Sequence, residues 1–134
     1  IHKLAQIEME GVMVRENVVL SKSKCFAVCI MQLVQYLGQN RRPYFIIDQI
    51  GRSGTSIGAN VTEAQHAISE KEFLQKMYIA YKECSETLYW LDLLHASQYI
   101  EAEMHHSLSE KCRELEKLLT MITKTTASHL NKKI

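Results

Sequence analysis

The chain has 134 residues, of which 46% are hydrophobic and 23% charged, and its formal net charge is only +1. This length suits one domain with a single core, and the charge excludes the strongly basic composition by which many nucleic-acid-binding proteins are recognised. One proline and five glycines are too few for the frequent turns of a β-sandwich or barrel, so the composition predicts an all-α protein.

Residues 1–17 contain Gly11 and a β-like run at Val12–Val14, and they show no sustained helical period. We expect them to form an N-terminal arm, or an extension foreign to the native chain, ahead of a four-helix bundle over residues 18–134. No apolar run approaches the roughly 20 residues that span a bilayer, and no signal-peptide pattern stands at the start. These features favour a cytoplasmic protein without a membrane partner.

Four amphipathic segments follow in chain order, with expected bounds of about 21–39, 44–67, 70–97 and 101–130. The first repeats apolar residues from Phe26 to Leu37 at spacings of three and four. Pro43 suits the first turn of the second helix, and Ser69 with Glu72 has the spacing of a capping box at the start of the third. Short connections make consecutive helices antiparallel neighbours. We therefore predict an antiparallel up-down-up-down four-helix bundle with a short N-terminal arm.

Two Glu-x-x-His pairs, Glu63 with His66 and Glu103 with His106, have the spacing found in di-iron carboxylate bundles. In the predicted topology these pairs lie at opposite ends of the bundle, roughly 30 Å apart along the helices, so they cannot share a metal. No histidine is spaced to activate a cysteine locally, and buried cysteines usually act as small apolar residues. We predict no catalytic residue, no metal and no cofactor.

Three glycines, Gly51, Gly54 and Gly58, fall in the interior of the second helix, where each costs roughly 1 kcal/mol relative to alanine. They share one face, which predicts the close approach of another helix. A polar stripe lies on a neighbouring face, and a ligand phosphate or the third helix is its natural partner. We favour a structural polar network between the second and third helices. Its predicted members are Ser56, Asn60, Glu63 and Glu86.

The third helix carries more aromatic side chains than one core can hold. Those off the core seam are Tyr78, Tyr81, Tyr89 and Trp90. Because Tyr and Trp are enriched at interfaces, these residues predict an oligomer interface, with partial burial under neighbouring side chains as the alternative. Six basic residues are candidate nucleic-acid contacts if ring symmetry repeats them into a basic belt. They are Arg41, Arg42, Arg52, Lys71, Lys76 and Lys82.

Three stretches, SGTSIGANVTE at 53–63, KEFL at 71–74 and YIAYKECSET at 78–87, resemble the four-helix-bundle family encoded by intervening sequences of bacterial large-subunit ribosomal RNA genes. The likeness spans residues 20–126. It implies a homopentameric barrel of bundles, and a relationship to accessory proteins of diversity-generating retroelements, which bind nucleic acid and a reverse transcriptase. Gly58 stands where many members have proline and Ala64 where many have glycine, and the chain is less basic than the nucleic-acid-binding relatives.

The sequence therefore leads to two hypotheses about function. The first is a non-enzymatic, homo-oligomeric binding module, pentameric by family resemblance, that binds RNA or DNA. The second is a protein-interaction scaffold, or an accessory to a reverse-transcriptase-like partner, without direct nucleic-acid contact.

Overall fold

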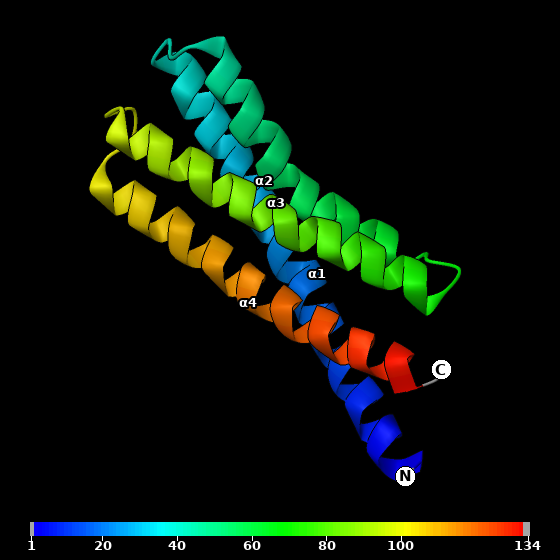
Figure 1. Cartoon of the computed structure of the whole chain (residues 1–134). Coiled ribbons are helices and arrows are strands. Elements are labelled where there is room, and N and C mark those ends of the chain that lie inside the picture. The colour runs from blue at the N-terminus through cyan, green and yellow to red at the C-terminus, as the bar shows by residue number, and fades with distance from the viewer. Residues whose placement is uncertain (1, 133–134) are drawn as a thin grey trace.

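The computed structural model describes the backbone of residues 2–132 and the side chains of residues 10–132. Its helices are α1 (His2–Gln39), α2 (Tyr44–Ala64), α3 (Glu70–Ala96) and α4 (Ala102–Lys132). The α1–α2 and α3–α4 turns lie at one end of the molecule, and the α2–α3 turn lies at the other end with both termini (Figure 1). This is the up-down-up-down bundle predicted from the sequence.

Each helix packs against two neighbours. Helices α1 and α3 each pack against α2 and α4, and within the described residues no Cα atoms of a diagonal pair of helices come within 8 Å of each other. Buried positions recur at spacings of three and four along each helix, as in a coiled-coil seam. The largest fully buried side chains include Phe26, Ile30, Leu37, Ile50, Ile57, Met77, Leu91, Leu94, Leu115, Leu119 and Ile122.

The expected start of the first helix near residue 21 was wrong, because α1 runs unbroken from His2. Val12 and Val19 are buried and recur at seven-residue intervals before Phe26, so the apolar seam begins well upstream of the expected start. Valine has a modest helix propensity, and this local signal masked the longer period. Residue 1 and the side chains of residues 2–9 lie outside the described part of the chain.

Helix α1 is apolar on more than its core face. By length and composition alone, the segment Glu10–Gln39 is apolar enough to cross a membrane, with 28% of its most apolar stretch buried in the bundle. Val14, Val28 and Met31 are exposed to solvent in the monomer. The apolar character of α1 therefore exceeds what the core uses and leaves an apolar surface on its outer side.

The glycines of α2 allow α1 to approach closely. A Cβ added at Gly54 would lie 2.6 Å from Cγ1 of Ile30, and one at Gly51 would lie 3.2 Å from Cγ2 of Val34. At Gly58 the nearest atom would be the backbone oxygen of Ser23, at 3.3 Å. The prediction that these glycines admit a neighbouring helix is confirmed, and that helix is α1.

The N-terminal cap of α3 forms at the predicted residue. The Glu72 amide donates to Ser69 Oγ at 3.1 Å, as expected for a capping box. The Glu72 carboxylate, however, accepts from the Ile68 amide at 2.9 Å rather than from the Ser69 amide. The cap thus reaches one residue further back into the α2–α3 turn than the standard spacing implies.

The two turns at the other end share one geometry. Arg41 and Gln98 adopt positive φ angles of 56° and 62°, and the Arg42 amide donates to the Leu37 carbonyl at 3.0 Å. Such a bond across a left-handed residue is a Schellman motif, and the α3–α4 turn repeats it. The guanidinium of Arg42 then lies 4.6 Å from the centre of the Tyr99 ring, which joins the two turns by a cation–π contact.

Replacing Gly54 by alanine is expected to destabilise the protein by about 1–3 kcal/mol, because the new methyl group would overlap the branched base of Ile30. Denaturant unfolding measures this change. Gly38→Ala is the matched control, since a Cβ there meets nothing within 4 Å and better helix propensity makes it neutral or stabilising by up to about 1 kcal/mol. Equal effects of the two substitutions would contradict close packing at Gly54.

Candidate functional site

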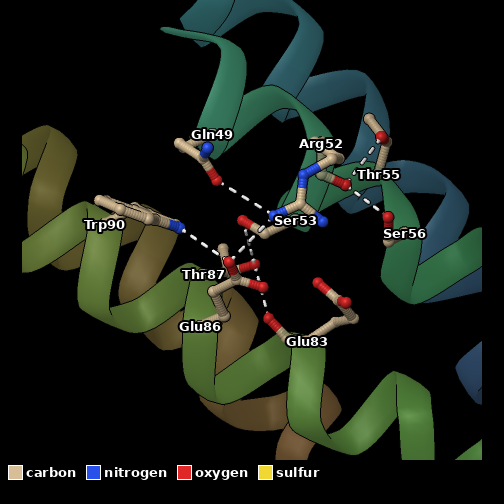
Figure 2. A network of polar contacts seen from close by, with 9 residues as sticks. All are labelled: Gln49, Arg52, Ser53, Thr55, Ser56, Glu83, Glu86, Thr87 and Trp90. Carbon is tan, nitrogen blue, oxygen red and sulfur yellow. Dashed lines mark hydrogen bonds and ion pairs between the residues drawn. The ribbon is translucent and has the colours of Figure 1, made fainter. Parts of the chain in front are cut away.

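A buried hydroxyl pair joins α2 to α3. Thr87 Oγ1 and Ser53 Oγ are hydrogen-bonded at 3.1 Å, and both side chains are fully buried. Figure 2 shows the two hydroxyls meeting between the helices. Because each hydroxyl satisfies the other away from water, the pair specifies the register between α2 and α3.

A half-exposed network lies on the solvent side of this pair. Arg52 donates to Gln49 Oε1 at 3.0 Å and to Glu86 Oε1 at 3.1 Å. The indole nitrogen of Trp90 donates to the same Glu86 oxygen at 3.4 Å, so one carboxylate collects donors from both helices (Figure 2). The Arg52 guanidinium is thereby occupied within the protein.

The four residues predicted as a structural polar motif divide into two kinds. Ser56 Oγ donates to the Arg52 carbonyl at 2.6 Å, and Asn60 Nδ2 donates to the Ser56 carbonyl at 2.8 Å, so both bond within α2. Glu63 and Glu86 take part in contacts between α2 and α3: Glu63 pairs with Lys76 at 2.7 Å and Glu86 with Arg52. The contacts of this motif that cross between the helices are therefore ion pairs at the surface.

The buried hydrogen bond between Ser53 and Thr87 was not predicted from the sequence. Both residues occupy seam positions, since Ser53 is buried beside Gly54, and Thr87 falls between the buried Cys84 and Leu91. A polar residue on each of two adjacent seams was the available signal. The more conspicuous exposed stripe of α2 obscured it.

Glu83 lies beside the network on α3. Burial raises the pKa of its carboxyl, and a hydrogen bond with Glu86 and the Glu86 charge raise it further, while Arg52 and Lys82 act in the opposite direction. Two carboxyl groups this close do not both ionise freely. The Glu83 carboxyl therefore holds its proton to a higher pH than an exposed glutamate does.

The outer face of α3 carries a ridge of four residues spaced by four, three and four positions. We call Tyr78, Lys82, Ser85 and Tyr89 the α3 ridge. Tyr78 is 53% exposed and Tyr89 is 56% exposed.

The other two predicted interface residues, Tyr81 and Trp90, are partly buried against the core. Tyr78 stacks on Tyr81 with ring centroids 5.8 Å apart, and Tyr89 meets Trp90 edge-on at 4.9 Å. Tyr81 and Trp90 thus anchor the aromatic pairs to the core, whereas Tyr78 and Tyr89 present their rings to solvent.

The six predicted nucleic-acid contacts do not form one patch on a single chain. Arg41 and Arg42 lie in the α1–α2 turn, whereas Lys71 lies in the first turn of α3 at the opposite end. The separation along the bundle is on the order of 35 Å. Lys82 lies between these ends on the α3 ridge.

Two of the six are already matched by carboxylates. Arg52 pairs with Glu86 at 3.1 Å and Lys76 with Glu63 at 2.7 Å. The hydrogen bond that the Lys76 ammonium donates to the Glu63 carboxylate, followed by the negative charge of Glu63, raises the pKa of Lys76. Their positive charge is therefore partly cancelled locally, and Arg41, Lys71 and Lys82 are the exposed members of the set outside these two ion pairs.

Cys84 and Cys112 meet in the core, where Cys112 Sγ donates to the Cys84 carbonyl at 3.4 Å. Hydrogen bonding with Cys112 and then burial raise the pKa of the Cys84 thiol, which keeps it protonated and unreactive. Cys25 on α1, by contrast, is exposed. Within the described residues, no group of three or more His, Cys, Asp or Glu side chains is placed to hold a metal.

A groove that the sequence analysis did not predict lies between α1 and α4, near the α3–α4 turn. It encloses about 540 Å³. Its lining combines apolar side chains, Cys29, Leu33, Met104 and Leu108, with the polar or charged Gln32, Tyr36, Glu101, Glu103, Ser107 and Lys111. The first and last helices of the chain form it, so no local sequence pattern reports it.

Four antiparallel helices around a continuous apolar seam make this a four-helix-bundle protein. Within that class, the chain belongs to the 23S rRNA-intervening sequence protein family, whose model matches residues 15–121. It is similar to the crystal structure of a protein of unknown function from the S23 ribosomal protein family of Bacteroides thetaiotaomicron. That protein is 44% identical, with a TM-score of 0.80, and the match covers 82% of this chain and 98% of that one. No curated protein matches the sequence.

Glu83→Gln is expected to stabilise the protein at neutral pH, and the gain should shrink as the pH falls. Because the folded-state pKa of Glu83 is raised, the folded protein holds a proton where the unfolded chain has lost it. The free energy of unfolding therefore falls as the pH rises from the unfolded-state pKa of Glu83 to its folded-state pKa. Above that range, the ionised Glu83 carboxylate lowers the stability. A glutamine amide can donate to Glu86 without adding a charge.

Melting temperatures of both proteins, measured from neutral pH down to about pH 4, check this expectation. Glu103→Gln, which alters an exposed carboxylate on α4, is the control and should not show the same pH-dependent gain. A stabilisation by Glu83→Gln that is constant over the whole range would contradict the assigned cause.

Proposed function

We propose that the protein is a non-enzymatic binding module that acts as a homo-oligomer, with five copies expected from its family resemblance. The α3 ridge carries this proposal. Tyr78 and Tyr89 each expose more than half of their surface, yet both are held in place by partly buried aromatic neighbours. Large, ordered and exposed aromatic side chains are typical of protein interfaces.

A structural role for the α2–α3 network fits this proposal better than a catalytic one. Ser53 and Thr87 bond to each other, and Arg52 is held by Gln49 and Glu86. The network thus joins α2 to α3, the helix that presents the ridge.

Light scattering on the purified protein is expected to give a mass that is a multiple of the 15.5 kDa chain, with five copies as the expected number. The exposed apolar area on α1 and α3 should favour association over the concentration range of ordinary purification. A monomer across that range would overturn the homo-oligomeric proposal.

Nucleic acid is the ligand class that we propose for the assembled protein. Arg41 in the α1–α2 turn and Lys71 and Lys82 on α3 are exposed, and a ring would repeat each of them once per copy. A net charge of +1 per chain is weak alone, so any binding must arise from this repetition and must depend on salt.

Arg41→Gln is expected to weaken binding to a single-stranded RNA several-fold. It should also reduce the slope of log affinity against log salt by up to about 0.7 for each phosphate that the arginine neutralises in the unaltered protein. Fluorescence anisotropy over a salt series measures both. Lys124→Gln, an exposed basic residue on α4 outside the candidate set, is the matched control. Absence of binding by the unaltered protein at low salt, or affinity independent of salt, would remove nucleic acid from the proposal.

A protein-interaction scaffold is the second candidate, including an accessory to a reverse-transcriptase-like partner. The ion pairing of Arg52 and Lys76 favours it, because little unpaired positive charge then remains near the centre of the α2–α3 surface. The neighbouring genes provide a test, since an adjacent reverse transcriptase gene supports the accessory role.

A further inference from the structure

We propose that the α3 ridge of one copy places Tyr89 in the α1–α4 groove of the next copy, so that the subunits associate head to tail. This inference rests on the proposed homo-oligomeric function and adds which two surfaces meet. The partner is a second copy of this chain.

The two surfaces complement each other in shape and polarity. Tyr89 is 56% exposed, and the groove offers apolar side chains from Leu33, Met104 and Leu108 together with polar side chains that could meet a phenol hydroxyl. Its volume of about 540 Å³ falls in the range of cavities, roughly 300–1,000 Å³, that accept an organic group. A tyrosine ring therefore has room there. Val28, exposed on α1, extends the apolar surface beyond the groove.

The ridge and the groove also lie at matching levels of the bundle. Along α3, Tyr89 is about 12 Å from Ser97, and along α4, Leu108 is about 9 Å from Ala102. These helix ends adjoin the same turn. In a ring whose axis runs along the bundles, equivalent residues of all copies share one level. Two surfaces that meet in such a ring must therefore lie at the same distance along the bundle within one copy. Tyr89 and the groove meet this requirement, because both lie about 9–12 Å from the α3–α4 turn.

Charge supports the same pairing. Lys82, the charged member of the ridge, lies about 22 Å from Ser97 along α3, and Glu114 lies about 18 Å from Ala102 along α4. Glu114 is on the α1 side of α4, because it pairs there with Lys22 at 2.5 Å, and its side chain remains 51% exposed. A docked Lys82 would come within about one helical turn of this carboxylate.

Within one chain, the α3 ridge cannot dock in the α1–α4 groove. Helices α1 and α3 stand on a diagonal of the bundle, and within the described residues none of their Cα atoms come within 8 Å of each other. The ridge and the groove-bearing side of α1 therefore face away from one another. Pairing unlike surfaces of successive copies gives a ring when the rotation closes and a filament when it does not.

Two variants test the pairing, one for each surface. Tyr89→Ala removes the ridge side chain, and Ser107→Trp fills the groove from an exposed position on its rim. Tyr44→Ala is the control for the first, because Tyr44 is 82% exposed on α2. Ser21→Trp is the control for the second, because Ser21 is exposed beside a different groove, between α1 and α2.

Each test variant is expected to be a folded monomer by light scattering and circular dichroism, while both controls keep the mass of the unaltered protein. An equimolar mixture of the two test variants should double in mass. The Tyr89→Ala chain keeps an intact groove, and the Ser107→Trp chain keeps an intact ridge, so one contact can form and no further growth follows.

The outcomes separate this inference from the proposed function. A monomeric unaltered protein would overturn both. An oligomeric unaltered protein whose two test variants keep its mass would overturn the pairing alone, and so would a mixture of monomeric variants that stays monomeric. If Tyr89→Ala does not fold, Tyr89→Gln repeats the ridge test with a polar side chain of good helix propensity.

Discussion

The rest of the structure depends on one constraint, which is that each of four helices must bury an apolar seam of three- and four-residue spacing against two neighbours. The seam packs closely between α1 and α2, where a Cβ added at Gly54 would lie 2.6 Å from the side chain of Ile30. Short turns set consecutive helices antiparallel, and a repeated backbone geometry stops α1 and α3 at the same end.

Polar groups within this seam serve its register. The Ser53–Thr87 pair is buried and mutually bonded, and Cys112 bonds to the Cys84 carbonyl across the α3–α4 contact. Burying such groups is tolerable only when each finds a partner. Outside the seam, Arg52, Glu86 and Trp90 continue the contact between α2 and α3 to the surface, so polar contacts between these helices extend from the core to solvent.

The exposed side chains outside the core seam also indicate which surfaces are available for association. Helix α1 remains apolar on its outer side, and α3 exposes two tyrosines that rest on partly buried aromatic neighbours. Exposed basic residues are spread over both ends and partly paired. A single chain thus exposes apolar side chains close together on α1 and on α3, whereas its exposed basic side chains are dispersed.

The sequence by itself determined the bundle, its helix order, the close approach at the glycines and the family. Each of these follows from local information: apolar spacing, capping residues, short connections and a contiguous motif. It failed at the start of α1, where valine-rich composition hid a seven-residue period that becomes decisive only when Val12 and Val19 find a core. Only the tertiary structure decided that Ser53 meets Thr87, that Ser56 and Asn60 bond within their own helix, and that α1 and α4 form a groove. Those outcomes depend on the rotation and spacing of helices distant in sequence, and a one-dimensional pattern does not specify them.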